Sequence, residues 1–440
     1  MSLSDHPRAY GTAALTVAFV AGIFVTLGFK DLYPELETRY ERQKTKSRRG
    51  SILFGPVKLE DREGVFGANY DRGNGIVDGV EGTIGNTPLI KLRSLSEATG
   101  CIILAKAEFL NGAGGSPKDR VALNMIQVAE EQGLLSPGRG DTIYEGTVGS
   151  TGISLAVLAR ARGYKAHICM PNDMAIEKSD LLHHLGATVE RVPVAPITDP
   201  GHFVNLARTR AKEHTAASDT PSRGFFADQF ESLANYSAHM KTTGPEIYAQ
   251  TEGRLDAFVA GAGTGGTIAG VAKHLKEERG LEGRLRVVLA DPQGSGLYNK
   301  VRHGVMYSPT EREGTRRRTQ VDTMVEGIGI NRVTENFEAG RGLVDDAVKV
   351  TDEQACRMAR WLVEHDGVFV GSSSAVNCVA AVVTALKMPK DSRVVTILCD
   401  SGSRHLSKFW KHIAAMGLED EARDQDEDLL AVLGLQDLRR

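Results

Sequence analysis

The chain has 440 residues, of which 41% are hydrophobic and 25% charged, and its 53 Lys and Arg residues nearly balance its 56 Asp and Glu residues. This composition excludes collagen, coiled coils and wholesale disorder, and the length predicts two packed lobes or domains. The formal net charge of −3 provides no general attraction for nucleic acid, so we expect no nucleic-acid partner.

The first predicted element is an apolar segment near the N-terminus. Residues 11–29 carry no charged side chain, and at about 1.5 Å per residue they would span about 28 Å, close to the thickness of a bilayer core. A secretory signal has a basic start and a shorter apolar stretch, whereas Arg8 is the only Lys or Arg before this run. We therefore predict a membrane anchor within residues 1–30, with a cleaved signal or a matrix presequence as the alternative.

Basic residues follow the predicted anchor. Between positions 39 and 49 six Lys and Arg residues face the single acid Glu41, and a positive flank stays in the cytosol. The rest of the protein is therefore predicted to face the cytosol, with residues 31–77 as a basic linker. Short anchors of this kind resemble the signal anchors of mitochondrial outer-membrane proteins, and the endoplasmic reticulum is the alternative location.

Between about residues 80 and 410, short β-branched runs alternate with helical patterns. Strands are predicted at residues 101–109, 142–145, 166–170, 188–192, 257–260, 286–290 and 394–398. Helices are predicted at residues 151–162, 267–278, 352–364 and 375–386. This alternation predicts an α/β fold, with parallel sheets that are covered by helices on both faces. Ligands of such sheets bind beyond the carboxyl ends of the strands, so the loops there are the candidate site.

The first of these loops, residues 111–120, contains Lys118 directly before a predicted helix. The partial positive charge at a helix start eases the loss of a proton from a lysine, which makes Lys118 a candidate amine nucleophile. For this loop alone, a solvated lysine beside Asp119 is the preferred interpretation.

Three further loops between strands and helices are rich in glycine and hydroxyl groups. Residues 145–152 offer hydroxyls and N–H groups that suit a carboxylate. Residues 261–267 suit a phosphate, although their G-x-G-x-x-G pattern, followed later by Asp291, leaves a dinucleotide open as well. Residues 371–374 follow an apolar strand predicted at 367–370. Each loop also has an ordinary capping explanation, since Ser and Thr favour helix starts.

The C-terminal residues 411–440 form an acidic tail, for which a short amphipathic helix and a frayed end are both open. Five cysteines are scattered along the chain without any metal-ligand spacing. We expect them to be reduced core thiols in a reducing compartment, and we expect no disulfide framework and no metal site.

The four loops in this order, with IGNTPLIKL before them and DSGSRHLS after them, resemble the fold-type II pyridoxal-phosphate enzymes, specifically the cysteine synthase and cystathionine β-synthase family. The resemblance covers about residues 78–410 and displaces the dinucleotide interpretation. It implies a two-lobed catalytic domain like the tryptophan synthase β-chain, with a small lobe inserted at about 115–235. It also implies pyridoxal 5′-phosphate as cofactor, small amino-acid and sulfur substrates, and a homodimer. Residues 314–332 and the apolar run are similar to the membrane-anchored, cysteine-synthase-like branch of fungi.

The resemblance assigns roles residue by residue. Lys118 of the S-x-K-D-R motif would form the Schiff base with the cofactor, and Ser373 would meet the pyridine nitrogen. The loop that would hold the cofactor phosphate consists of Gly263, Thr264, Gly265, Gly266 and Thr267. The residues that match the family's contacts to the substrate carboxylate are Thr147, Gly149, Ser150, Thr151 and Gln229.

Two features depart from the family pattern. Ser150 stands where the family has an Asn that hydrogen-bonds the phenolic oxygen of the cofactor, so that cofactor contact would be shorter, pass through water or be absent. The loop before Lys118 is one residue longer than usual, and Pro117 directly precedes the lysine. Both departures are expected to affect the reaction rate more than the binding of the cofactor.

The implied reaction is β-replacement on an amino acid. Pyridoxal phosphate is an electron sink, and a serine hydroxyl cannot keep its pyridine nitrogen protonated as a carboxylate would, which favours β-elimination over transamination. Lys118, once released, is placed to take the α-proton as general base. The main hypothesis is the formation of L-cysteine from O-acetylserine and sulfide.

Two alternatives remain open. One is a cystathionine-forming enzyme that uses serine and homocysteine, suggested by residues 111–118 and 291–295, although no regulatory module follows residue 410. The other is a membrane-tethered binding or regulatory protein on a degenerate enzyme scaffold, suggested by Ser150.

Overall fold

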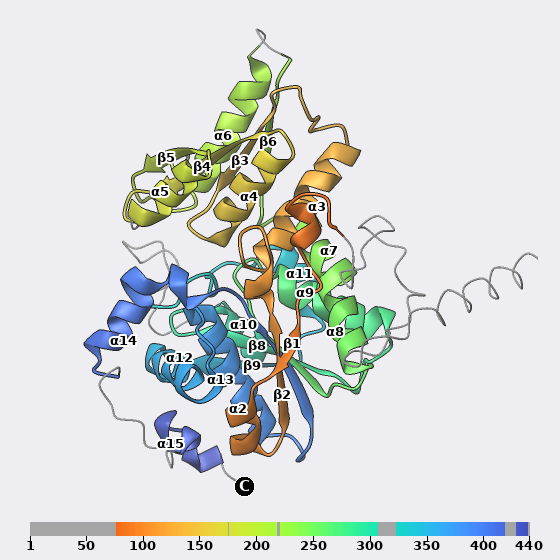
Figure 1. Cartoon of the computed structure of the whole chain (residues 1–440), viewed down its shortest axis with the longest axis vertical. Helices are drawn as coiled ribbons and strands as arrows, with labels where there is room; N and C mark the ends of the chain where they lie inside the picture. Colours follow the sequence, from red (N-terminus) through yellow and green to blue (C-terminus); the bar gives the residue numbers. More distant parts are fainter. Residues whose placement is uncertain (1–75, 175, 218–220, 307–322, 419–427, 439–440) are drawn as a thin grey trace, which may run out of the picture. The chain divides into compact units, whose positions relative to one another are not determined.

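The computed structural model of the protein describes residues 76–174, 176–217, 221–306, 323–418 and 428–438. Two β-sheets organise this part of the chain, one of six strands and one of four (Figure 1). The strands of the smaller sheet all lie between the second and seventh strands in the sequence. The predicted α/β architecture with parallel sheets is therefore confirmed.

The six-stranded sheet is parallel except at one edge. Its strands, in spatial order, are β1 (Leu89–Lys91), β2 (Ile102–Ala107), β10 (Arg393–Leu398), β7 (Ala257–Gly261), β8 (Arg286–Pro292) and β9 (Asp346–Val350). Within this sheet β1 alone runs antiparallel, paired with β2. Because the other five strands point the same way, the loops that follow them meet along one edge of the sheet.

The four-stranded sheet is parallel throughout. Its strands, in spatial order, are β5 (Thr188–Val192), β4 (Lys165–Pro171), β3 (Thr142–Gly146) and β6 (Gly224–Phe226). Side chains alternate between the two faces of a strand. On one face Ile143 and Ile168 join a buried hydrophobic core. The side chains of Tyr144, His167 and Cys169 therefore point to the opposite face.

Helices connect the strands and cover both sheets. Those of the small lobe are α3 (Lys118–Glu131), α4 (Ser150–Ala161), α5 (Ile176–His184) and α6 (Phe203–Ala216). Those of the large lobe are α2 (Arg93–Thr99), α7 (Ala234–Ala238), α8 (Gly244–Thr251), α9 (Gly266–Ala272), α10 (Leu297–His303), α11 (Glu335–Arg341), α12 (Asp352–Asp366), α13 (Ser372–Leu386), α14 (Lys411–Ala415) and α15 (Leu429–Val432). Short 3₁₀ turns lie at Glu81–Thr83, Glu108–Leu110, Gly402–Arg404 and Gln436–Leu438, and π-helical turns at His239–Thr243, Lys273–Glu278 and Leu406–Trp410.

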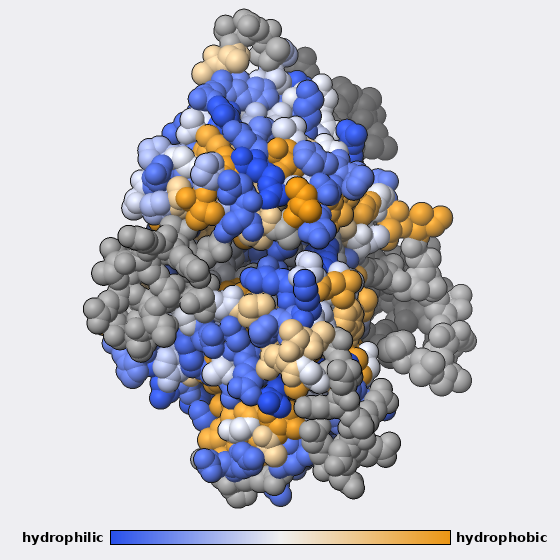
Figure 2. All heavy atoms as spheres, turned by 90° about the vertical axis from the view of Figure 1, so that its left-hand side faces the viewer, coloured by the Kyte–Doolittle hydropathy of each residue, from blue (hydrophilic) through white to orange (hydrophobic). Residues whose placement is uncertain are grey.

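Neighbouring residues of each central strand belong to two different hydrophobic cores. In β7, Val259 belongs to the core shared with α12 and α13, whereas Phe258 belongs to the core shared with α8 and α9. Residues 372–385 of α13 are all buried. Both faces of the large sheet are therefore covered, which explains why its strands are continuous apolar runs in the sequence. On the face of the molecule shown in Figure 2, hydrophilic side chains predominate and hydrophobic ones form small separate patches.

Seven of the eight predicted strands and the four predicted helices are confirmed, with ends that differ by at most three residues. The helix predicted at 267–278 consists of α9 followed by the π-helical turn at Lys273–Glu278. The sequence analysis missed β1, β6 and β9. The strands β1 and β6 have three residues each, too few to show a periodic pattern.

The strand predicted at residues 367–370 is wrong. Gly367, with φ of 66°, ends α12 in the left-handed conformation, and the Val368 N–H bonds the carbonyl of Leu362. These residues therefore complete a helix terminus. Of the four, only Val370 forms a bridge, a single one to Ser401.

Near the C-terminus, the structure contains the helix α15, one of the two alternatives that the sequence left open. Leu429, Leu430, Leu433 and Leu435 are buried in the core of the large lobe. The side chain of Asp428 accepts a hydrogen bond from the Leu430 N–H and so caps the helix. The predicted anchor at residues 11–29 lies outside the described residues, and no helix in the described ranges is long and apolar enough to cross a membrane.

Candidate active site

Lys118 is the first residue of α3, and the side chain of the next residue holds the loop before it. The carboxylate of Asp119 accepts hydrogen bonds from the N–H groups of Gly114 (2.7 Å) and Gly115 (2.9 Å) and from the hydroxyl of Ser154 in α4 (2.6 Å). Asp119 therefore fixes the longer loop that the sequence analysis noted and ties it to the neighbouring helix.

The amine of Lys118 lies in a low-dielectric environment. Burial lowers the pKa of Lys118, and the nearby Cys399 and Asp400 oppose this shift only in part. Within the described part of the chain the Nζ atom forms no hydrogen bond or ion pair, and the backbone N–H donates to the Ser116 hydroxyl (3.2 Å). Lys118 thus has a larger neutral fraction than a surface lysine, as a nucleophile or a base requires.

A buried ion network anchors the first turn of α3 behind Lys118. The guanidinium of Arg120 donates two hydrogen bonds to Glu108 (both 2.8 Å) and two to Glu246 of α8 (2.6 and 2.8 Å). Lys106 of β2 also donates to Glu246 (2.6 Å). The side chains of Arg120, Glu108 and Lys106 are fully buried. Burial raises the pKa of Glu108, but the charge and hydrogen bonds of Arg120 outweigh it and lower the pKa to about 2.

The glycine loop after β7 presents unpaired backbone N–H groups. The N–H groups of Gly263, Thr264, Gly265 and Thr267 bond no other residue of the described ranges. Gly265 has a φ of 82° and precedes α9, and a Cβ atom on Gly263 would lie 2.3 Å from the carbonyl oxygen of Gly327. The glycines therefore allow a tight turn that leaves several N–H groups free at a helix start, an arrangement that suits a phosphate.

Two buried side chains orient the hydroxyls of this loop. Asn235 donates to the Thr264 hydroxyl (3.0 Å) and to the carbonyl of Gln229 (2.8 Å). The ring of His239 bonds the Thr267 hydroxyl through Nε2 (3.2 Å). Burial, together with the charges of Arg120 and Lys118, lowers the pKa of His239 to about 3, so its ring is neutral.

The loop after β3 meets Gln229 as the resemblance implies. Thr147 and Thr151 are buried, and Gly149 has open space where a side chain would begin. The hydroxyl of Thr151 donates to Gln229 Oε1 (2.5 Å). The Gln229 N–H donates to the carboxyl of Glu145 (3.2 Å), and burial raises the pKa of Glu145 to about 8. Glu145 is thus protonated for much of the neutral range, and adds little negative charge to the loop after β3.

Ser150 contacts the segment after β10. Its hydroxyl lies 3.5 Å from the Asp400 carboxylate and 3.4 Å from the Arg404 guanidinium. Asp400 also accepts a hydrogen bond from His405 Nε2 (3.0 Å), and its Oδ1 atom is buried without a partner in the described part of the chain. The position that departs most from the family pattern therefore lies beside a carboxylate and a guanidinium.

Ser373 lies at the start of α13, buried against the end of β10. Its hydroxyl bonds the thiol of Cys399, and burial raises the pKa of that thiol to about 11. Cys399 in turn lies close enough to Lys118 for the two groups to shift each other's pKa. Ser373 and Lys118 therefore both lie close to Cys399.

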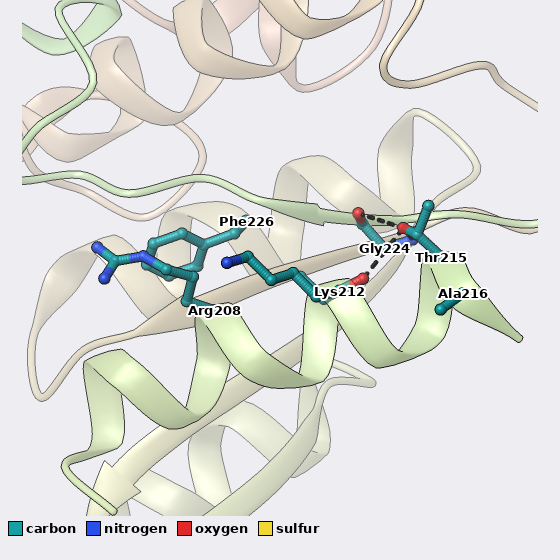
Figure 3. A pocket seen from close by; sticks show the side chains of 7 residues that line it. Arg208, Lys212, Thr215, Ala216, Gly224 and Phe226 are labelled. Atoms are coloured by element: carbon teal, nitrogen blue, oxygen red, sulfur yellow. Dashed lines mark hydrogen bonds between the residues drawn. The ribbon is translucent and has the colours of Figure 1, made fainter. Parts of the chain in front are cut away.

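The contacts above bring all the predicted site residues together. Hydrogen bonds through Gln229 and Asn235 link the loop at Thr147–Thr151 with the loop at Gly263–Thr267. Lys118 lies close to Cys399 and Asp400, which follow β10, and Cys399 in turn bonds Ser373 at the start of α13. The hollow drawn in Figure 3, about 480 Å³ between α6 and β6, includes none of these residues.

The sequence analysis missed several residues of the site. Asn235 lies six residues after Gln229, and Asp400 and His405 stand inside the segment DSGSRHLS, which was used only to identify the family. Their spacing to partners far away in the sequence offers no local signal. His239 stands alone in a helical stretch, and only the tertiary structure brings it to Thr267.

An ion cluster connects the two lobes beside the site. Lys178 of α5 bonds Glu326 (3.0 Å), and Glu326 lies 3.5 Å from His405 Nδ1. Burial alone would lower the pKa of His405, but its bonds with Asp400 and Glu326 raise it to about 9. Since the ordinary value is 6.5, charged His405 stabilises the fold fully below pH 6.5, and this stabilisation is lost as the pH rises through about 9.

We predict that His405→Gln lowers stability by about 1–3 kcal/mol at pH 6 and by much less at pH 9.5, because the imidazolium disappears over this interval. Thermal unfolding of both proteins across this pH range measures the difference. A gap in melting temperature that stays constant with pH would show that His405 acts only through packing.

Comparisons with known proteins identify the family of the chain. Residues 80–400 match the family described as pyridoxal-phosphate dependent enzyme. Cysteine synthase 2 of Neurospora crassa is 74% identical over 458 residues, with 100% of each chain covered. The putative mitochondrial cysteine synthase of Saccharomyces cerevisiae is 55% identical over 352 residues, covering 80% of this chain and 86% of the relative. The crystal structure of O-ureido-L-serine synthase has a TM-score of 0.66 and 31% identity, covering 80% of this chain and 98% of that chain.

The fold and the site together define a two-lobed enzyme with a loop suited to an anionic cofactor and a partly buried lysine of lowered pKa. The chain belongs to the pyridoxal-phosphate dependent enzyme family, of fold type II, and cysteine synthases are among its similar relatives. The resemblance inferred from the loops is therefore confirmed.

The residues present fit pyridoxal 5′-phosphate, which is the cofactor of this family. The free N–H groups at Gly263–Thr267 suit its phosphate, and the amine of Lys118 suits its aldehyde. Ser373 offers a neutral hydroxyl for the pyridine nitrogen.

Proposed function

We propose that the protein forms L-cysteine from O-acetylserine and sulfide by β-replacement. The observation that carries the proposal is the position of Lys118, an amine of lowered pKa close to Cys399 and Asp400 after β10 and to His239, whose ring bonds Thr267 of the glycine loop. Bound pyridoxal phosphate supplies the electron sink for breaking the bond to the leaving group. The names and identities of the cysteine synthase relatives support the choice of product.

The protein's own residues would have three roles in this reaction. N–H groups and hydroxyls at Thr147–Thr151, with Gln229, would bind the substrate carboxylate and orient the α-carbon. Lys118 Nζ would accept the α-proton, because its lowered pKa leaves part of it neutral. Ser373, a hydroxyl rather than a carboxylate, would leave the pyridine nitrogen uncharged and so favour elimination over transamination.

A substrate panel tests the proposal. Purified holoenzyme is offered O-acetylserine or serine, each with sulfide or homocysteine, and the products are separated by chromatography. We expect the highest kcat/KM with O-acetylserine and sulfide. A higher value with serine and homocysteine would support the cystathionine-forming alternative, and the absence of turnover in every pairing by cofactor-loaded protein would support a binding or regulatory role.

Ser150 provides a prediction about the rate of the first chemical step. An Asn amide reaches further than a serine hydroxyl, so Ser150→Asn would allow a direct hydrogen bond to the cofactor's phenolic oxygen, worth about 1 kcal/mol. We expect a rise of about fivefold in the single-turnover release of acetate from O-acetylserine. The affinity for pyridoxal phosphate should change little, because the loop at Gly263–Thr267 and Lys118 are untouched.

The control for this variant is Ser150→Ala, which removes the hydroxyl without adding an amide. If Ser150→Asn folds and binds the cofactor but releases acetate no faster than wild type, Ser150 is adapted to Asp400 and Arg404, which it contacts, and the cysteine synthase proposal is weakened.

We also propose that residues 11–29 anchor the protein in the mitochondrial outer membrane, with residues 31–77 as a linker and residues 78–410 as the catalytic domain in the cytosol. The acidic residues 411–440 would form a C-terminal segment whose leucines pack into the core of that domain. The charge pattern around the apolar run and the mitochondrial name of the yeast relative support this location. Protease added to intact mitochondria should digest the catalytic domain. Full protection with a shortened N-terminus would establish import instead.

We further propose a homodimer, which light scattering of the purified catalytic domain would measure.

A further inference from the structure

Three side chains with metal-binding atoms lie close together on the small lobe, away from the site described above. His167 and Cys169 are two residues apart on β4, so both point to the same face of the sheet. Glu190 of β5 is the register partner of Cys169. This face is the one opposite the hydrophobic core of Ile143 and Ile168, and α6 packs against it, as Figure 1 shows.

The distances between the three potential ligand atoms suit a small cation. His167 Nε2 lies 3.1 Å from Glu190 Oε2, and Cys169 Sγ lies 4.0 Å from the same oxygen. All three ligand atoms lie within 4.8 Å of one another. Ligands bound to tetrahedral zinc at about 2.0–2.3 Å are roughly 3–4 Å apart. Small side-chain rotations would therefore bring these atoms onto one zinc ion.

The surroundings hold the imidazole in place and leave it partly accessible. The ring of His167 stacks on that of Tyr144, with centroids 4.9 Å apart, and the Tyr144 hydroxyl bonds His214 Nδ1 of α6 (3.1 Å). The side chains of His167 and Glu190 are 19% and 27% exposed, whereas Cys169 is buried. An ion and one water molecule can thus reach the cluster from solvent.

Arg210 of α6 would compete with a metal ion for the Glu190 carboxylate. Its guanidinium donates to Glu190 Oε1 (2.9 Å) and to Glu190 Oε2 (3.2 Å). A cation on Oε2 would displace the hydrogen bond from Arg210 to Oε2 but leave room for the hydrogen bond to Oε1. The metal therefore has to compete with a positive charge that already neutralises Glu190, which weakens its binding.

We propose that His167, Cys169 and Glu190 form a zinc site, with water as the fourth ligand and Arg210 as an internal competitor. A nitrogen, a sulfur and a carboxylate oxygen are the donors that zinc accepts. Binding replaces the S–H bond of Cys169 by a zinc–sulfur bond, and the released proton passes to solvent. The site ties β4 to β5 and is independent of the proposed function.

The test uses untagged, chelator-treated holoenzyme titrated with zinc chloride by calorimetry. We expect one zinc ion per chain, and we expect His167→Asn, Cys169→Ser and Glu190→Gln each to weaken binding at least tenfold, since loss of even an outer contact costs about 10–100-fold. Arg210→Gln should tighten binding by at least about threefold, because the competing charge is gone. Cys356→Ser, a buried thiol of the large lobe, should have no effect.

X-ray absorption of the zinc-loaded protein supplies a readout that does not depend on stability. We expect one sulfur scatterer at about 2.3 Å from zinc, and its loss in Cys169→Ser. Zinc bound with no sulfur in its shell, no zinc binding above that of Cys169→Ser, or unchanged affinity in a folded Arg210→Gln variant would each overturn the proposal.

Discussion

Replacing Lys118 with alanine is expected to abolish the cofactor's covalent link and to lower turnover by about 10³-fold or more, since the same amine would bind the cofactor and move the α-proton. The purified variant should lack the visible absorption of wild-type protein, and treatment with borohydride should label no peptide of this region. Wild-type protein should instead carry the reduced cofactor on the peptide that contains Lys118.

Lys91→Ala is the matched control, because Lys91 is an exposed lysine of β1 outside the site. It should keep the absorption band, the labelled peptide and the activity. If Lys118→Ala retained a band that borohydride reduces, another lysine would hold the cofactor, and the proposed division of roles in the site would be wrong.

The second large effect concerns stability. Arg120→Leu should lower the free energy of unfolding by about 3–5 kcal/mol, because it leaves Glu108 and Glu246 in the protein interior with Lys106 as their nearby positive partner. Burial makes the charged carboxylates costly, and the guanidinium now supplies four of their hydrogen bonds. Urea unfolding of the variant should show a lower midpoint.

Arg341→Leu is the control with the same chemical change at the surface. Arg341 pairs with Glu338 on α11, and both side chains are more than 40% exposed, so the cost should stay below about 1 kcal/mol. Equal losses in the two variants would mean that the buried network of Arg120 contributes no more than a surface pair, contrary to our account of the S-x-K-D-R motif.

Much of the fold follows from local patterns that the sequence contains. Strands such as β7 and β8 are continuous apolar runs because both of their faces are buried, and helices such as α12 begin at a residue that caps them. Residues 367–370, which were wrongly predicted to be a strand, have the apolar composition that is typical of strands. In the structure, Gly367 adopts the left-handed conformation, and these residues end α12 instead.

The sequence by itself determined the family, the cofactor and the loops of the site. The glycines and hydroxyls of those loops form short local motifs, because the backbone of a tight turn or a helix start favours these residue types. Only the tertiary structure decided which distant groups orient them: Asn235 against Thr264, His239 against Thr267, and Asp400 with His405 beside Ser150. The same is true of His167, Cys169 and Glu190, which strand register brings together. The physical reason is that hydrogen bonds and charges act over a few ångströms in space, whereas the partners stand tens or hundreds of residues apart in the chain.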